Sequence, residues 1–194
     1  LVGSEMCIRD SYYILTAPFL TSDKIGVSSA NVPAVMVIAQ VAEIFVMALL
    51  LPYFITKMGL RKVLVIGVLA WPARYIIFAI GKPAWLVIAS LSLHGFCFVF
   101  FFTAAFIYVD TVSPKDIRHS AQSLITLVTY GIGNYLGSLF AGKVQTYFTT
   151  DAGTNWTSVF LVPCVLTILS ALAFLLFFKA VSYTHLTLPT NREV

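Results

Sequence analysis

Five long runs of apolar residues constrain the fold of this chain more than any other feature. They occupy residues 33–55, 62–80, 84–109, 120–148 and 156–178, and each is at least 19 residues long. The hydrocarbon core of a bilayer is about 30 Å thick, and a helix of about 20 residues crosses it. The runs are continuously apolar rather than alternating, which predicts transmembrane helices and not the strands of a membrane barrel. Residues 12–20 are apolar but too few to cross, and we interpret them as the last part of a sixth span.

The composition supports a membrane protein and excludes most other classes. Of the 194 residues, 59% are hydrophobic and only 10% are charged, and the mean hydropathy is +0.93. A soluble domain carries about 25% charged residues, so this chain needs lipid as its solvent. The same composition excludes disorder, collagen, a disulfide mini-protein and a nucleic-acid-binding module. The basic balance implies no nucleic-acid partner, because the basic residues stand in short clusters between apolar runs. The sequence has no phosphate-binding loop, metal-ligand spacing or nucleophile–base pattern, which predicts neither an enzyme nor a metal or cofactor site.

The two ends of the sequence differ from the rest. Residues 1–11 and 181–194 resemble translated adaptor DNA from transposase-based sequencing libraries, in the strings Met6-Cys7-Ile8-Arg9-Asp10 and Ser182-Tyr183-Thr184-His185-Leu186. We therefore leave them out of fold reasoning, as one would a fusion scar. The native region is expected to be residues 12–180, an internal fragment of a longer gene.

The basic residues of the short loops predict the orientation in the membrane. Short loops rich in Lys and Arg remain on the cytoplasmic side. The expected spans place six basic residues on one side and three on the other, which predicts a multi-pass protein of the cell (inner) membrane with a cytoplasmic C-terminus. The six are Lys57, Arg61, Lys62, Lys115, Arg118 and Lys179, and the three are Lys24, Lys82 and Lys143.

Glu43 is the polar residue whose position most strongly indicates function. It lies ten residues into its run, about 15 Å deep at 1.5 Å per residue. An ionisable side chain at that depth costs about 2.5–3.5 kcal/mol or more on insertion, so function is the default interpretation. Gln40 lies on the same helix face, and the pair is predicted to bind a polar solute, with Glu43 able to carry a proton. The alternative is a structural ion pair between Glu43 and Arg74.

Three further polar residues inside the runs each have a functional and a structural interpretation. Arg74 follows Pro72, and it either satisfies a carbonyl freed by the proline or holds an anionic or carbonyl group of a substrate. His94 either serves a substrate or proton pathway or is a buried histidine satisfied by a neighbour. Asn134 lies among the glycines of residues 131–137, which favour close helix packing, and is predicted to face a cavity.

A basic loop and several motifs resemble a known family. The loop Thr56-Lys57-Met58-Gly59-Leu60-Arg61-Lys62 resembles the cytoplasmic loop D-R-x-G-R-R of major facilitator transporters, with Thr56 in place of the acid. Within that superfamily, the chain is similar over residues 12–179 to the C-terminal half of the nucleoside:proton symporter family. The segments that carry this likeness are Gln40-x-x-Glu43, Gly67-Val68-Leu69-Ala70-Trp71-Pro72-Ala73-Arg74-Tyr75, Leu93-His94-Gly95-Phe96-Cys97, Ser120-Ala121-Gln122-Ser123-Leu124-Ile125-Thr126 and Tyr130-Gly131-Ile132-Gly133.

The resemblance implies an all-α fold, the C-terminal six-helix half (helices 7 to 12, the first truncated) of a twelve-helix transporter that works by alternating access. It implies that Gln40 and Glu43 line the nucleoside site and that Phe98 stacks on the substrate. Val99 stands where similar proteins have an acid, which leaves Glu43 as the midplane acid of this half and the expected proton-coupling residue.

The basic loop residues Lys57, Gly59, Arg61 and Lys62, together with Arg74 and Asp110, are expected to serve structure or gating. Asp110 lies at the end of the third run, near the basic residues of the following loop. The expected partners are a nucleoside or similar polar solute, the lipid bilayer and the missing N-terminal half, with the proton as coupling ion and no cofactor. The alternatives are a transporter of the same fold for another solute, such as a sugar, or an exporter, and a membrane sensor or scaffold that does not transport.

Overall fold

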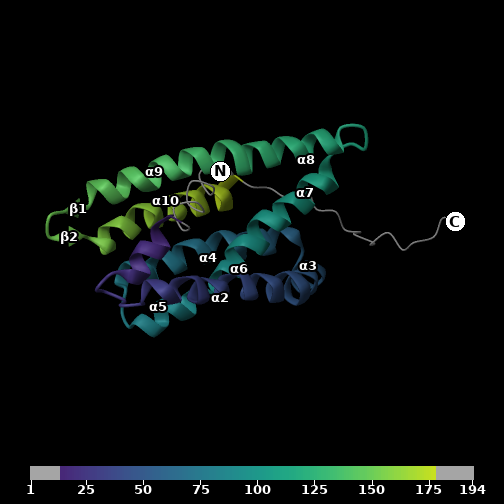
Figure 1. Ribbon diagram of the computed structural model, residues 1–194. Coiled ribbons are helices and arrows are strands. Elements are labelled where there is room, and N and C mark those ends of the chain that lie inside the picture. Colours follow the sequence, from purple (N-terminus) through teal and green to yellow (C-terminus); the bar gives the residue numbers. More distant parts are fainter. Residues whose placement is uncertain (1–13, 178–194) are drawn as a thin grey trace.

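Each long apolar run of the sequence corresponds to a helical stretch of the computed structural model, in which residues 14–177 are described (Figure 1). Five stretches are long and apolar enough to cross a membrane: Ser29–Met58, Leu60–Ile80, Ala84–Val112, Arg118–Tyr147 and Trp156–Phe177. Ahead of them, residues 14–21 form a further short helix. The two ends interpreted as adaptor, residues 1–11 and 181–194, and the basic residue Lys179 lie outside the described residues.

Two of the five stretches are single helices, and three are built from several segments. The single helices are α4 (Leu60–Ile80) and α10 (Trp156–Phe177), which run on through Pro72 and Pro163. The first stretch consists of η1 (Ser29–Asn31), α2 (Val32–Phe45), η2 (Val46–Leu50) and α3 (Leu51–Met58). The third consists of α5 (Ala84–Ser90), α6 (Leu93–Cys97), η3 (Phe98–Thr103) and α7 (Ala104–Val112), and the fourth of α8 (Arg118–Thr126), η4 (Leu127–Gly133) and α9 (Asn134–Tyr147). The segments η2, η3 and η4 are π-helical, which means that their turns are wider than those of an α-helix.

The connections follow from turn-forming residues in the sequence. Asn31 precedes α2 and Pro33 lies in its first turn, where the fixed φ of proline suits a helix start. Gly81, with φ of 66°, closes α4 in the left-handed conformation that glycine adopts without strain. The polar residues between the last two spans form a small antiparallel hairpin of β1 (Thr149–Thr150) and β2 (Gly153–Thr154).

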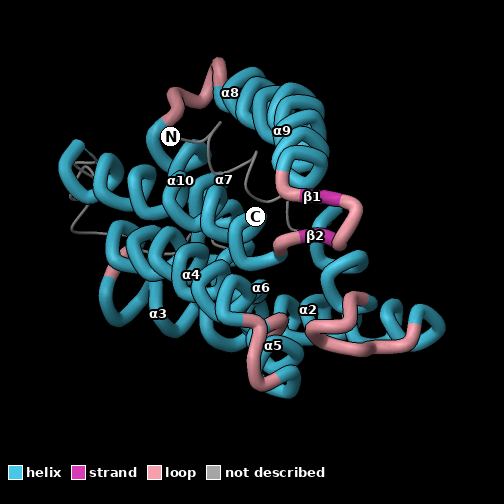
Figure 2. Tube along the Cα trace, turned by 90° about the vertical axis from the view of Figure 1, so that its left-hand side faces the viewer, coloured by secondary structure: helices cyan, strands magenta, loops and turns pink. Residues whose placement is uncertain are grey.

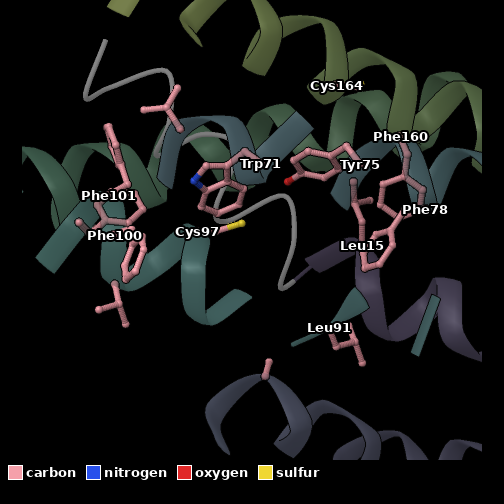
Figure 3. Close-up of a cluster of buried hydrophobic side chains, with 14 of the residues drawn as sticks. Leu15, Trp71, Tyr75, Phe78, Leu91, Cys97, Phe100, Phe101, Phe160 and Cys164 are labelled. Carbon is pink, nitrogen blue, oxygen red and sulfur yellow. The ribbon is translucent and has the colours of Figure 1, made fainter. Parts of the chain in front are cut away.

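Helices α4 and α10 form the most extensive pair of the bundle and carry much of its core. Figure 3 shows Trp71, Tyr75 and Phe78 along α4, with Phe160 of α10 beside Phe78 at a ring-centroid distance of 5.2 Å. Such edge-to-face contacts are a favoured arrangement of aromatic rings. The pair therefore fixes the framework against which the other helices pack.

The peripheral helices leave wide faces uncovered. In the most apolar window of each stretch, 56% of the residues are buried in Leu60–Ile80 and in Ala84–Val112, but only 17% in Ser29–Met58 and 22% in Arg118–Tyr147. Figure 2 shows the α8–α9 rod on one side of the bundle and α2 and α5 on the opposite side. The faces of the first and fourth spans are thus left to lipid or to protein outside the described residues.

Two glycines allow close helix approaches within the described part of the chain. A Cβ atom built on Gly67 of α4 would lie 2.6 Å from the carbonyl carbon of Phe100 in η3. One built on Gly95 of α6 would lie 2.8 Å from the carbonyl carbon and oxygen of Ala42 in α2. At both places the absence of a side chain lets two backbones touch, which fixes the register of α2, α6 and α4 relative to one another.

Candidate functional site

The residues predicted from the second and third spans meet in the middle of the bundle. The Arg74 Nη1 atom lies 3.0 Å from His94 Nδ1, joining α4 to α6. The neighbour of His94, Gly95, touches the backbone of α2 at Ala42 and Glu43. Glu43, Arg74 and His94, spread over about fifty residues of sequence, thus lie on three helices that converge at one level.

Arg74 lies against a wall of aromatic faces from its own helix. Its guanidinium carbon is 4.7 Å from the ring centre of Trp71, 5.6 Å from Tyr75 and 5.9 Å from Phe78. A cation over an aromatic face is attracted by the negative charge of the ring, by about 2 kcal/mol when both are removed from water. Arg74 is fully buried, so this setting offsets part of the cost of placing a charge at membrane depth.

His94 connects the arginine to the predicted stacking residue. Its ring stacks on Phe98, the first residue of η3, with centroids 5.9 Å apart and planes inclined by 30°. Trp71 meets the same imidazole edge-on at 6.5 Å. Phe98 also contacts Phe102 at 5.6 Å. The three predicted residues Arg74, His94 and Phe98 therefore form a continuous series of contacts.

Burial sorts the predicted residues into two layers. Gln40 is exposed, while Glu43 and Phe98 are half-buried. His94 and Arg74 are both 0% exposed. The first three can meet a solute at the surface of this bundle, and the last two lie behind them.

Asn134 is not brought to this group. It is half-buried at the start of α9, directly after η4. Helix α9 packs on α10 and lies on the side of the bundle away from α2 (Figure 2). Any shared site of Asn134 with Glu43 and His94 therefore needs a solute or a further part of the protein between them.

The basic loop and Asp110 lie at one end of the bundle. Gly59, with φ of 80°, separates α3 from α4 and has the positive φ that favours glycine. The flanking side chains Lys57, Arg61 and Lys62 are exposed. Figure 1 shows the α7–α8 loop at the same end as α3, and there Asp110 lies 3.6 Å from Arg118, as a partly exposed ion pair.

Sequence reasoning missed a polar cluster at the opposite end. The Lys24 ammonium donates to the Ala79 carbonyl at 3.1 Å and to Thr157 Oγ1 at 2.8 Å, and that hydroxyl donates to the same carbonyl at 2.9 Å. Burial, and next the charge of Lys82, lower the pKa of Lys24 from its ordinary value. The contacts tie the end of the first helix to the ends of α4 and α10, beside a cavity of about 620 Å³.

The wide turns were also missed, although they stand beside the predicted site residues. Segment η2 begins three residues after Glu43, η3 begins at Phe98, and η4 ends directly before Asn134. Wide turns inside α-helices occur frequently at functional sites. In runs that are apolar on every side, no periodic signal distinguishes such a turn from an α-helix.

Comparison with known proteins places this arrangement in a family. The model of a family described as "Nucleoside H+ symporter" matches residues 5–183. The chain belongs to this family. Its members are transporters rather than enzymes, as the sequence predicted.

Individual relatives and structures agree with this assignment. The chain is 29% identical to the nucleoside permease NupG of Escherichia coli (strain K12), over all of this chain and 47% of NupG. It is 33% identical to the putative nucleoside transporter YegT of the same organism, over 87% of this chain and 41% of YegT. The crystal structure of a NupG D323A mutant aligns with this chain at a TM-score of 0.80 and 27% identity. The alignment covers 92% of this chain and 47% of the NupG chain. The chain thus spans about half the length of the curated relatives it matches, and the predicted fold of a transporter half is confirmed.

Proposed function

We propose that the chain is the C-terminal half of a transporter that imports nucleosides together with protons by alternating access. Family membership supports the class of transport. The observation that carries the site is the close approach of α6 to α2, where Gly95, three residues before Phe98, meets the backbone of Ala42 and Glu43. A transporter of this kind lies in the cell membrane, and we infer a cytoplasmic C-terminus from the basic loops.

The accessible residues suit the chemistry of a nucleoside. The amide of Gln40 both donates and accepts hydrogen bonds, and an ionised Glu43 accepts them, which matches the hydroxyl groups of a ribose. The half-buried ring of Phe98 offers an aromatic face for the base, and base–aromatic stacking is worth about 1–3 kcal/mol.

Glu43 also provides a means of coupling. Protonation converts its carboxylate from an acceptor only to a donor and acceptor, which changes what it can bind. A proton and a nucleoside that share this residue affect each other's affinity reciprocally. Transport of one then depends on the gradient of the other.

The first experiment is to reassemble the source DNA with adaptor removed and to read the codons that flank residues 12 and 180. Uptake of labelled uridine is then measured in cells that produce the full-length protein, with Glu43→Gln and, as a control of the same chemistry, Asp116→Asn. Asp116 is exposed, outside the spans.

We expect Glu43→Gln to abolish accumulation against a gradient, while Asp116→Asn accumulates uridine as the wild type does. Unchanged accumulation by Glu43→Gln would remove Glu43 from the coupling step. If unlabelled nucleosides fail to compete for uptake, the cargo is a different solute, and ligand binding without flux would indicate a sensor or scaffold.

A further inference from the structure

Arg74 and His94 lie too deep to meet a solute at the surface of the bundle. Both side chains are fully buried, whereas Phe98, which the imidazole contacts, is half-buried. A role of the two buried residues in recognition must therefore act through a side chain in front of them. The contact series Arg74–His94–Phe98 identifies that side chain.

The hydrogen bond between the two residues fixes the protonation of the histidine. A guanidinium group has only donors, so His94 Nδ1 accepts the bond from Arg74 Nη1 at 3.0 Å. An imidazole that accepts at Nδ1 is neutral and carries its proton on Nε2. Arg74 thus selects one tautomer of His94.

The same bond fixes the plane of the imidazole. The guanidinium is held over the faces of Trp71, Tyr75 and Phe78 on α4, and its planar donors point in set directions. The bonded imidazole is therefore held in orientation from one side, and Trp71 meets it edge-on from another. The stacked Phe98 ring, inclined by 30° to it, rests on a fixed support.

We propose that Arg74 and His94 are a positioning pair that sets the orientation of the Phe98 ring, and through it the preference for the base of the nucleoside. This inference rests on the proposed function and adds to it the determinant of base selectivity. The pair acts without contacting the substrate.

Two substitutions of His94 separate its functions. His94→Asn keeps an acceptor near the position of Nδ1 but removes the ring under Phe98. His94→Phe keeps a ring but removes the acceptor for Arg74. His119→Asn is the matched control, because it makes the same histidine-to-asparagine change at an exposed position of α8.

The measurement is the dissociation constants of adenosine and uridine for the purified full-length protein, together with the number of binding sites. A purine presents more ring area to Phe98 than a pyrimidine, so loss of the stacking orientation weakens adenosine more. We expect both His94 variants to lower the adenosine-to-uridine affinity ratio, by up to about tenfold, which is the size of one aromatic contact. His119→Asn is expected to leave the ratio as in the wild type.

A purely structural role would lower the number of binding sites and leave the ratio unchanged, and that result in both His94 variants overturns the proposal. If the wild type binds neither nucleoside, the proposed function itself fails, and the positioning role fails with it. The ¹⁵N spectrum of the His94 imidazole gives a readout that needs no ligand. It is expected to show the proton on Nε2, and a proton on Nδ1 contradicts the proposed pair.

Discussion

Substitution of Gly95 tests whether the close approach of α2 and α6 builds the site. An alanine Cβ at this position would lie 2.8 Å from the Ala42 carbonyl carbon and oxygen and 3.0 Å from the Glu43 nitrogen. Ordinary van der Waals contact begins near 3.4 Å, so the two helices must separate by about 0.6 Å. All three atoms belong to backbone and cannot turn aside as a side chain can. Overpacking of this kind costs about 1–3 kcal/mol.

The same displacement moves Glu43 away from the level of His94 and Phe98. We expect Gly95→Ala to raise the dissociation constant for uridine about tenfold, which corresponds to about 1.4 kcal/mol. Gly142→Ala in α9 is the matched control, because a Cβ there would have no heavy atom within 4 Å in the described part of the chain.

Thermal unfolding in detergent can be followed with a thiol-reactive dye, since Cys97 and Cys164 are both buried in the fold. We expect a lower midpoint for Gly95→Ala than for the wild type, and a midpoint for Gly142→Ala at or above that of the wild type. If Gly95→Ala matches the control in both midpoint and uridine affinity, the helix contact does not determine the site and this reasoning is refuted.

Three further substitutions test features around the site. Gly67→Ala brings a Cβ to 2.6 Å from the η3 backbone, and dye unfolding is expected to show a larger loss of stability than Gly95→Ala. Lys24→Met removes two hydrogen bonds and lowers the midpoint. Because burial and Lys82 lower the pKa of Lys24, the unfolded chain keeps this proton to higher pH. The unfolding free energy of the wild type, relative to that of Lys24→Met, should therefore increase as the pH rises toward 10.5. A decrease of this difference with rising pH would contradict the reasoning. Asp110→Asn breaks a partly exposed pair with Arg118 and should change the unfolding free energy by less than about 1 kcal/mol, so a larger loss would show that the pair holds α7 to α8.

The spans and their ends could be predicted because each depends on local sequence. About twenty apolar residues specify a membrane helix whatever its neighbours, and Pro33 and Gly81 stand at helix ends for conformational reasons of their own. The polar residues of the site were equally predictable, because an ionisable side chain in an apolar run is costly wherever that run packs.

The layering of the site could not be predicted, because it depends on the register between helices. Arg74 and His94 are twenty residues apart, and the packing of α4 against α6 and η3, close at Gly67, brings their faces together. Lys24 was counted only as a loop charge, since its partners lie 55 and 133 residues away in sequence. A single sequence contains no signal for such distant contacts.

The wide turn η3 affects how this chain can be compared with its relatives. A π turn adds one residue to an α-helix, and at 3.6 residues per turn each added residue rotates the remainder of the helix by about 100°. Val99, which the resemblance to the family sets against an acid when no gap is allowed, lies inside this turn. A homologue with an ordinary α-turn here would need a one-residue gap, and its acid would then be matched to a neighbouring position on another face. Deleting one residue from η3 would thus rotate α7 by about 100° relative to α6, which is a larger change to this chain than the loss of one side chain.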